Sequence, residues 1–213
     1  DVHDFVQSCT VCARRKGGRM RAWHNGLLQP IETQGPGELV LLDFIGPLPL
    51  TRQGNRHILV ILDHFTRWPE AYPTPDQSSG SVVNCLLDYI SRHGAPERIL
   101  SDNGSAFVAE VIKDTAELFN VAHSFTTAYH PQSNGAVERF NRTLRNMLTS
   151  YCEGTKNNDR WDALLPALLL AYRTTRNEAT KVSPFFINHG REARLPSSFG
   201  HLTPPRLRDP ANE

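Results

Sequence analysis

Three acidic residues occupy positions in the sequence where a carboxylate could do chemistry. Asp43 interrupts the apolar run LVLLDF, Asp102 follows a short apolar run in SDNGSAF, and Glu138 begins an amphipathic segment after a polar loop. A carboxylate inside an apolar strand is costly unless it is paired or binds a metal ion. Taken singly, each has an ordinary structural interpretation: a strand-end or capping residue for Asp43, a turn residue for Asp102, and an i,i+4 ion pair with Arg142 for Glu138.

Taken together, the three carboxylates indicate metal-dependent phosphodiester chemistry. In an open sheet with crossover helices, the ends of adjacent strands and the start of a helix converge. Carboxylate oxygens gathered there bind Mg²⁺ or Mn²⁺ and hold two ions about 3.5–4 Å apart, one activating the attacking hydroxyl or water and the other stabilising the leaving oxygen. Arg142 and Arg145, at helical spacing from Glu138, would then meet phosphates. We therefore predict that Asp43, Asp102 and Glu138 are catalytic residues and metal ligands.

Hydrophobic periodicity predicts the elements that position these residues. LVLLDF from Leu39, HILVILD and the weaker EAYPT predict three strands, and an antiparallel arrangement fits them best. A single apolar stripe predicts a helix over Ser78–His93, followed by a strand at RILS, a helix over Val108–Asn120 and a strand at AHSFT. Two further helices are predicted, from about Ala136 to Tyr151 and from about Asp159 onward. The order βββαβαβ followed by helices indicates an α/β fold.

At these residues the sequence resembles the integrases of LTR retrotransposons of the Ty3/gypsy type and, more distantly, retroviral integrases. Asp43 in LLDFIGPLP matches the first acid of the family's D,D-35-E triad, Asp102 in SDNGSAF the second, and Glu138 in YHPQSNGAVERFNRTL the third. The spacing of 35 residues between Asp102 and Glu138 is highly specific, because each acid lies in a sequence string that separately matches the family. ILVILDHFTRWPEAYP and SPFFINHGREARLP are also similar to the family, so the resemblance extends from about Cys9 to Pro196.

The resemblance implies an RNase H-like core with a five-stranded mixed sheet flanked by helices. It implies a polynucleotidyl transferase with endonuclease activity that uses Mg²⁺ or Mn²⁺, trims the 3′ ends of donor DNA with water and joins the new 3′-hydroxyl to target DNA. DNA contacts are expected for Gln132, Asn134 and Asn141 beside Arg142 and Arg145, and a plain turn role stays open for Gln132 and Asn134.

The resemblance also implies an assembly and a location. Two donor DNA ends must be joined together, so a homodimer of cores that assembles into a larger complex on DNA is expected. The expected location is the nucleus, where the enzyme would act on chromosomal DNA after travelling from the cytoplasm as part of a retroelement particle.

Both ends of the chain depart from the family pattern. CTVC, with Cys9 and Cys12, resembles the second half of an integrase His-His-Cys-Cys zinc module, whereas a complete zinc site needs four ligands. We expect Zn²⁺ only if His24 or another chain completes the site, and two free thiols otherwise. The expected organisation is a partial zinc module and linker over residues 1–36, the catalytic core over 37–196 and a flexible Pro-rich tail over 197–213, all cut from a longer chain.

Composition limits the alternatives. The 213 residues are 39% hydrophobic and 21% charged, with a formal net charge of +1, which excludes an intrinsically disordered chain, a coiled coil and a collagen-like fibre. Apolar runs are far shorter than the ~18 residues of a membrane span, so no membrane partner is expected. Two alternatives stay open: a host-domesticated integrase relative that binds DNA or protein without transposing, and a simple endonuclease or RNase H, which the matches beyond the triad disfavour.

Overall fold

The computed structural model describes residues 31–126, 135–153 and 159–195. Within these ranges the strands and helices predicted from periodicity are all present, with their ends shifted by a few residues, and one short helix is added. In chain order the elements are β1 (Leu39–Ile45), β2 (His57–Asp63), β3 (Pro69–Thr74), α3 (Ser79–His93), β4 (Arg98–Ser101), α4 (Glu110–Leu118), β5 (Ala122–Phe125), α5 (Gly135–Glu153), α6 (Trp161–Thr174) and α7 (Pro184–His189).

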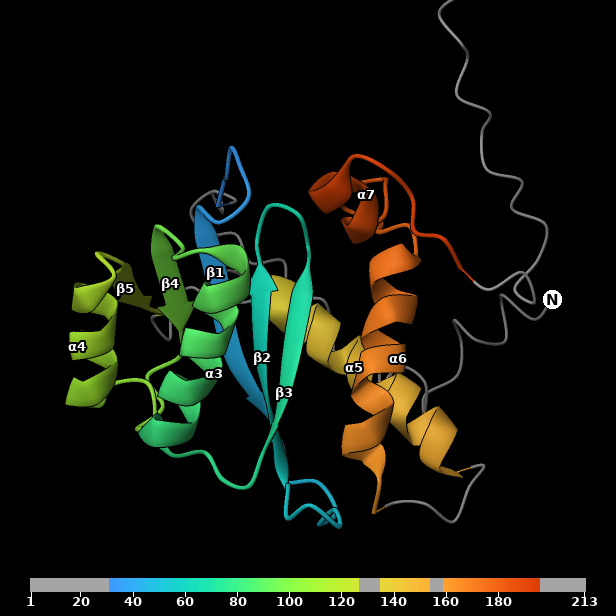
Figure 1. Ribbon diagram of the computed structural model, residues 1–213, viewed down its shortest axis with the longest axis horizontal. Coiled ribbons are helices and arrows are strands. Elements are labelled where there is room, and N and C mark those ends of the chain that lie inside the picture. Colours follow the sequence, from blue (N-terminus) through green and yellow to red (C-terminus); the bar gives the residue numbers. More distant parts are fainter. Residues whose placement is uncertain (1–30, 127–134, 154–158, 196–213) are drawn as a thin grey trace, which may run out of the picture. The chain divides into compact units, whose positions relative to one another are not determined.

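The strands form one mixed sheet in the order β3-β2-β1-β4-β5 (Figure 1). The first three strands are antiparallel to one another, as predicted, with Asp43 of β1 opposite Val60 of β2. β4 joins the other edge of β1 in parallel, and β5 joins β4 in parallel. A parallel pair needs a crossover connection, which α3 and α4 supply.

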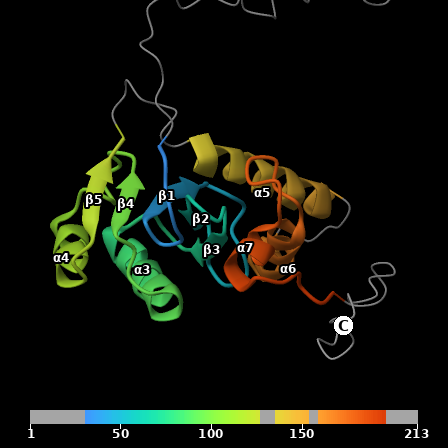
Figure 2. The ribbon, with the colours of Figure 1, turned by 90° about the horizontal axis from the view of Figure 1, so that it is seen from above.

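Helices cover both faces of this sheet. Viewed from above, α3 and α4 lie on one side of the strands and α5 on the other (Figure 2). On the first face, alternate strand residues pack with the two helices into a buried cluster that includes Val40, Leu42, Ile61, Leu86 and Ile112. On the second face, α5 packs against β1 and β2, and α6 packs against α5 and β3. Burial on both faces explains why β1 and β2 appear in the sequence as nearly continuous apolar runs.

A buried carboxylate, Glu70, ties β3 to α3 and α6. It accepts a hydrogen bond from Nε1 of Trp68 at 3.1 Å and forms an ion pair with Nη2 of Arg173 at 2.8 Å, and its Oε1 lies 3.1 Å from Nε2 of His93. Burial by itself raises the pKa of Glu70, but the His93 hydrogen bond and the Arg173 charge lower it to about 2. Glu70 is therefore an ionised link between three elements.

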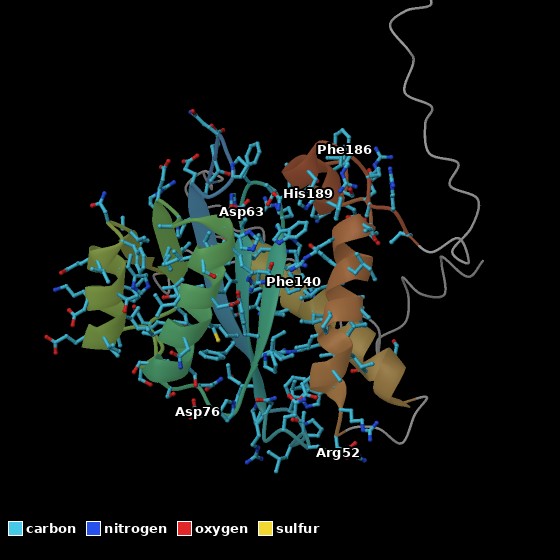
Figure 3. The ribbon with its side chains drawn as sticks, in the orientation of Figure 1. Arg52, Asp63, Asp76, Phe140, Phe186 and His189 are labelled. Carbon is cyan, nitrogen blue, oxygen red and sulfur yellow. The ribbon has the colours of Figure 1, made fainter. Side chains whose placement is uncertain are left out.

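The β2–β3 turn begins at Asp63, which organises the chain around it (Figure 3). Oδ1 of Asp63 accepts hydrogen bonds from the backbone N–H and hydroxyl of Thr66, both at 2.7 Å, and Oδ2 accepts one from the Gly37 N–H at 2.7 Å. Nearby, Oγ1 of Thr33 lies 3.1 Å from Nδ1 of His64. Residues Thr33 and Gly37, on either side of the predicted linker boundary at 36, thus both contact the β2–β3 turn.

Helix α7 is the element that periodicity does not predict, because its six residues are too few to show an apolar repeat. The hydroxyl of Ser183 accepts a hydrogen bond from the Phe186 N–H at 3.0 Å, Pro184 occupies the first turn, and Gly190 ends the helix with a left-handed φ of 66°. His189 of this helix (Figure 3) packs edge-on against Trp68, with the ring centroids 5.4 Å apart.

Backbone contacts divide the chain into two units, Asp1–Ile31 and Glu32–Glu213. The first unit and the tail after residue 195 lie outside the described residues, apart from Ile31, so the predicted domain boundaries stay predictions. Among the helices of the described ranges, not one has the length and apolar character required to cross a bilayer.

Candidate active site

Asp43 and Asp102 come from neighbouring parallel strands. Leu41 of β1 is opposite Leu100 of β4, and extending this register by two positions brings Asp102, which directly follows β4, opposite Asp43. Paired residues of neighbouring strands project from the same face of a sheet. The side chain of Asp43 is hydrogen-bonded to Asn141 of α5, so both carboxylates project from the face of the sheet that α5 covers. The two predicted carboxylates therefore lie at the carboxyl ends of two adjacent strands.

Asp43 is half-buried and held at both carboxylate oxygens. Oδ1 accepts a hydrogen bond from its neighbour's backbone N–H, that of Phe44, at 2.8 Å, and Oδ2 accepts one from Nδ2 of Asn141 at 2.7 Å. Burial raises the pKa of Asp43 from its ordinary 3.8 to about 6; the Phe44 hydrogen bond opposes this rise, and the charges of Asp102 and Glu138 add to it. Asp43 therefore lies near enough to the other two acids for their charges to raise its pKa.

Asp102 is exposed and oriented by a tight turn. Its Oδ1 accepts a hydrogen bond from the Gly104 N–H at 2.9 Å. A Cβ atom at position 104 would lie 2.9 Å from the same oxygen, closer than real Cβ contacts come. Just before Asp102, the hydroxyl of the buried Ser101 lies 3.0 Å from Nε2 of His123 on β5. The turn and the neighbouring strand therefore position the Asp102 carboxylate.

Helix α5 contributes the third acid. Glu138 is exposed in its first turn, and Arg142 and Arg145 are exposed one and two turns later. The charge of Arg145 lowers the pKa of Asp43, against the larger effect of burial. The opposite side of the helix is apolar and buried, which fixes the helix on the sheet; its buried residues are Ala136, Val137, Phe140, Leu144 and Leu148.

The acids do not form a ready metal cluster: within residues 31–126, 135–153 and 159–195, no three His, Cys, Asp or Glu side chains are grouped so as to hold a metal ion. The donor chemistry nevertheless fits a hard cation, because all three predicted ligands are carboxylates. Oδ1 of Asn141, beside Asp43, is buried and lacks a hydrogen-bond partner in the described structure. A cation near Asp43 would also favour the ionised form that burial and like charges disfavour.

The remaining predicted site residues have different outcomes. Asn141, predicted to contact DNA, is only 5% exposed and bonded to Asp43, so the structure gives it a positioning contact, and its contact with DNA stays a prediction. Gln132 and Asn134 lie outside the described residues, as do Cys9 and Cys12 of the predicted zinc module.

Sequence reasoning missed the contribution of Gly104 to the site. The Asn-Gly pair signals a turn, but the distance from position 104 to the Asp102 carboxylate depends on how the turn folds back. It also missed the contact between Ser101 and His123, which joins residues 22 positions apart through the pairing of β4 with β5. No sequence signal indicates that contact.

The sheet order and the helices on both faces define an RNase H-like domain, as predicted. The protein-family model described as "Integrase core domain" matches residues 33–131, a range that includes Asp43 and Asp102. The chain is 38% identical over 190 residues to the Gag-Pol polyprotein of avian reticuloendotheliosis virus. That match covers 89% of this chain and 16% of the polyprotein, so the chain spans about a sixth of this relative's length.

Solved structures agree with this fold. One is a chain of the simian T-cell lymphotropic virus intasome in complex with PP2A regulatory subunit B56 gamma. It superposes with a TM-score of 0.69 at 22% sequence identity, and the match covers 91% of this chain and 67% of that chain. Another is the HTLV-2 integrase catalytic core domain in complex with magnesium, in a trimeric form: TM-score 0.62, 20% identity, 74% of this chain and 100% of that chain covered.

Residues 33–131 therefore match the integrase core domain, and the chain is similar over most of its length to retroviral Gag-Pol polyproteins. The resemblance to integrases found in the sequence is thereby confirmed, and the Ty3/gypsy type is consistent with it.

Proposed function

We propose that this chain is a DNA integrase, a polynucleotidyl transferase in which Asp43, Asp102 and Glu138 are the catalytic residues. The observation that carries the proposal is the register of β1 and β4, which sets Asp43 and Asp102 opposite one another, together with the Asn141 hydrogen bond that ties the helix of Glu138 to Asp43. Burial raises the pKa of Asp43, and the charges of Asp102 and Glu138, which come from two other elements, raise it further.

We propose further that the three carboxylates hold Mg²⁺ or Mn²⁺. A divalent cation so held supplies activation of the attacking oxygen and neutralisation of the leaving oxygen. The magnesium complex of the HTLV-2 core supports this assignment by analogy. In this chain, Asn141 and the Phe44 N–H hold the Asp43 carboxylate in one orientation, and the Gly104 N–H does the same for Asp102.

The reaction would have two steps on DNA. In 3′-end processing, water attacks a phosphorus atom near the donor end, and the bond to the 3′-oxygen breaks, leaving a 3′-hydroxyl. In strand transfer, that hydroxyl attacks a phosphorus atom of the target, and a target 3′-oxygen leaves. Arg142 and Arg145, exposed on α5 beside Glu138, are suited to bind the phosphates that flank the reacting group.

The proposed setting is an assembly on chromosomal DNA. Because two donor ends are joined to one target, we propose that two cores pair and assemble into a larger complex on DNA. The intasome and the trimeric core among the similar structures support an oligomer by analogy. We propose that the complex acts in the nucleus, reached as part of a retroelement particle.

The test is a disintegration assay on a branched DNA substrate with Mg²⁺ or Mn²⁺, because this reverse reaction makes the smallest demand on segments outside the core. Metal-dependent resolution is expected, and Asp102→Asn and Glu138→Gln should each abolish it while DNA binding stays nearly intact. Glu110→Gln, an exposed acid at the start of α4, is the matched control and should keep full activity. Activity that survives Asp102→Asn would overturn the catalytic assignment, and a folded, metal-binding but inactive chain would favour a domesticated binding module.

A further inference from the structure

A cavity of about 590 Å³ lies between α5, the end of α6 and the β2–β3 turn, apart from the acidic site. Three arginines line it: Arg67 from the turn, Arg139 from α5 and Arg176 from the segment after α6. Thr143 and Met147 of α5 also line the cavity. At 100° of rotation per residue, they lie about 140° and 180° around the helix from Glu138. The cavity therefore faces away from the predicted catalytic side of α5.

Arg67 is the most unusual residue of the cavity. Its Nε and Nη1 atoms are buried without a hydrogen-bond partner in the described structure. A buried unpaired guanidinium N–H is strongly unfavourable, because water has been removed and nothing replaces it. The backbone of Arg67 is left-handed as well, with φ 61°, in a turn closed by its N–H bond to the Asp63 carbonyl at 3.1 Å. Arg67 therefore lines the cavity while two of its donor atoms are shielded from water and unpaired.

The charges around Arg67 are mixed. Burial lowers the pKa of Arg67 and the positive charge of Arg139 lowers it further, whereas Tyr172 and the Asp63 carboxylate raise it; the two guanidinium groups repel one another. Arg176 adds a third positive charge and is steadied by its Nε hydrogen bond to the Lys181 carbonyl at 2.6 Å. Glu178 is an acidic residue of the cavity lining, but none of the ion pairs among the described residues joins it to these arginines.

A hydroxyl group completes the donor set. Tyr172 lines the cavity, and its oxygen accepts a hydrogen bond from Nδ2 of Asn177 at 3.2 Å, which leaves its own proton free to be donated. Burial raises the pKa of Tyr172, so it keeps that proton at neutral pH. The hydroxyls of Thr143 and Thr175 are unsuited to this purpose, because they donate to backbone carbonyls within their own helices.

We propose that this cavity is an oxyanion site for a phosphate group, bound by the guanidinium groups of Arg67, Arg139 and Arg176 and by the hydroxyl of Tyr172. Planar guanidinium forks match phosphate oxygens and bind them through paired, charge-assisted hydrogen bonds. The phosphate comes from a nucleic-acid backbone or from a small soluble polyphosphate. The site does not depend on the proposed transfer activity, since its residues and its side of α5 are separate from the acids.

The experiment measures the binding of pyrophosphate to the purified chain by isothermal titration calorimetry and by thermal shift. We expect saturable binding at one site, weakened at least about tenfold in Arg67→Met and in Arg139→Met, because each removes charge-assisted hydrogen bonds. Arg52→Met is the matched control, because Arg52 is an exposed, paired arginine far from the cavity (Figure 3), and its binding should change less than about twofold. Arg67→Met should also raise the melting temperature of the ligand-free chain, because it removes an unpaired buried charge.

A second titration distinguishes the source of the phosphate. If a 20-base-pair DNA duplex competes with pyrophosphate and loses affinity in Arg67→Met, the site takes a nucleic-acid backbone phosphate. If pyrophosphate binds and the duplex does not compete, the site takes a small polyphosphate. The proposal is overturned if pyrophosphate does not bind saturably, or if Arg67→Met and Arg139→Met fold and bind it as the wild type does.

Discussion

Nδ2 of Asn141 donates a hydrogen bond to Oδ2 of Asp43 at 2.7 Å, across 98 residues of sequence. Asn141 lies one helical turn after Glu138, so this single bond fixes the helix of one predicted catalytic acid against the strand of another. The amide is 5% exposed, and its Oδ1 is buried without a partner in the described structure. Asn141 therefore acts on the site through Asp43.

The first prediction concerns this contact. Asn141→Ala should lower disintegration activity about 10–100-fold, because a carboxylate that loses the partner that orients it binds a cation less well. The chain should stay folded, with a loss of about 1 kcal/mol for the missing hydrogen bond. Asn146→Ala, an exposed asparagine of the same helix, is the control. Equal activity in both variants would remove Asn141 from the site.

The second prediction concerns the stability of Asp43 without divalent ions. The pKa of Asp43 is raised from 3.8 to about 6 in the folded chain, so the fold loses stability as the pH rises between these two values, and the loss is complete above about 6. Asp43→Asn should therefore increase the free energy of unfolding at pH 7.5 by up to about 3 kcal/mol, and the gain should vanish below pH ~4, where both states carry the proton. Asn141 can satisfy the new amide by turning its Oδ1 toward it.

Urea unfolding of both chains at pH 7.5 and pH 3.5 measures this difference. Asp114→Asn, an exposed acid of α4, controls for the loss of a negative charge and should leave stability nearly unchanged. Addition of Mg²⁺ should stabilise the wild type and not Asp43→Asn. A lower stability of Asp43→Asn at pH 7.5 would mean that burial does not disfavour the ionised carboxylate.

The third prediction concerns Glu70. Its depressed pKa means that its ionised form stabilises the fold above the unfolded value of 4.5, and that this stability is lost as the pH falls toward about 2. Glu70→Gln should cost about 3 kcal/mol at pH 7, because Arg173 and His93 lose a buried ionic partner. The deficit should shrink between pH 4.5 and pH 2. A deficit that does not depend on pH, measured against Glu97→Gln as a surface control, would contradict it.

The fourth prediction concerns Gly104. Gly104→Ala should lower disintegration activity while it leaves the melting temperature within a few degrees of the wild type, because the new Cβ meets the exposed Asp102 carboxylate rather than the core. Gly35→Ala is the matched control, since a Cβ at that position meets nothing within 4 Å. Full activity in Gly104→Ala would show that the Asp102 carboxylate can move aside without consequence.

Most of the fold follows from patterns that are local in the sequence. β1 and β2 are buried on both faces, so their residues form apolar runs, and α3 has a clear stripe that ends at Gly94. An Asp within such a run is visible without any knowledge of contacts, and the spacing between Asp102 and Glu138 was recognised through the family resemblance, so the acids could be proposed from the sequence; their catalytic role stays a prediction. Helix α7 was missed because six residues carry capping signals and no period.

Long-range contacts account for what the sequence does not reveal. Asn141 looks like an exposed polar residue of an amphipathic helix until β1 is docked beneath it. In the sequence, Arg67 looks like an ordinary surface arginine of a turn. Its guanidinium is buried only once α5 and α6 have packed beside that turn. Both depend on how helices pack on the second face of the sheet, which no local pattern records.

The alternation along β1 separates two kinds of mutational change. Val40 and Leu42 face the cluster under α3, and Asp43 faces α5, so exchanging one apolar side chain for another costs only repacking. Deleting or inserting one residue within β1 before Asp43 would reverse the faces of the strand. The acid would then point into the apolar cluster, and a leucine would point toward the predicted active site. Descendants of this chain should therefore exchange apolar residues of similar volume along β1 and keep its length unchanged.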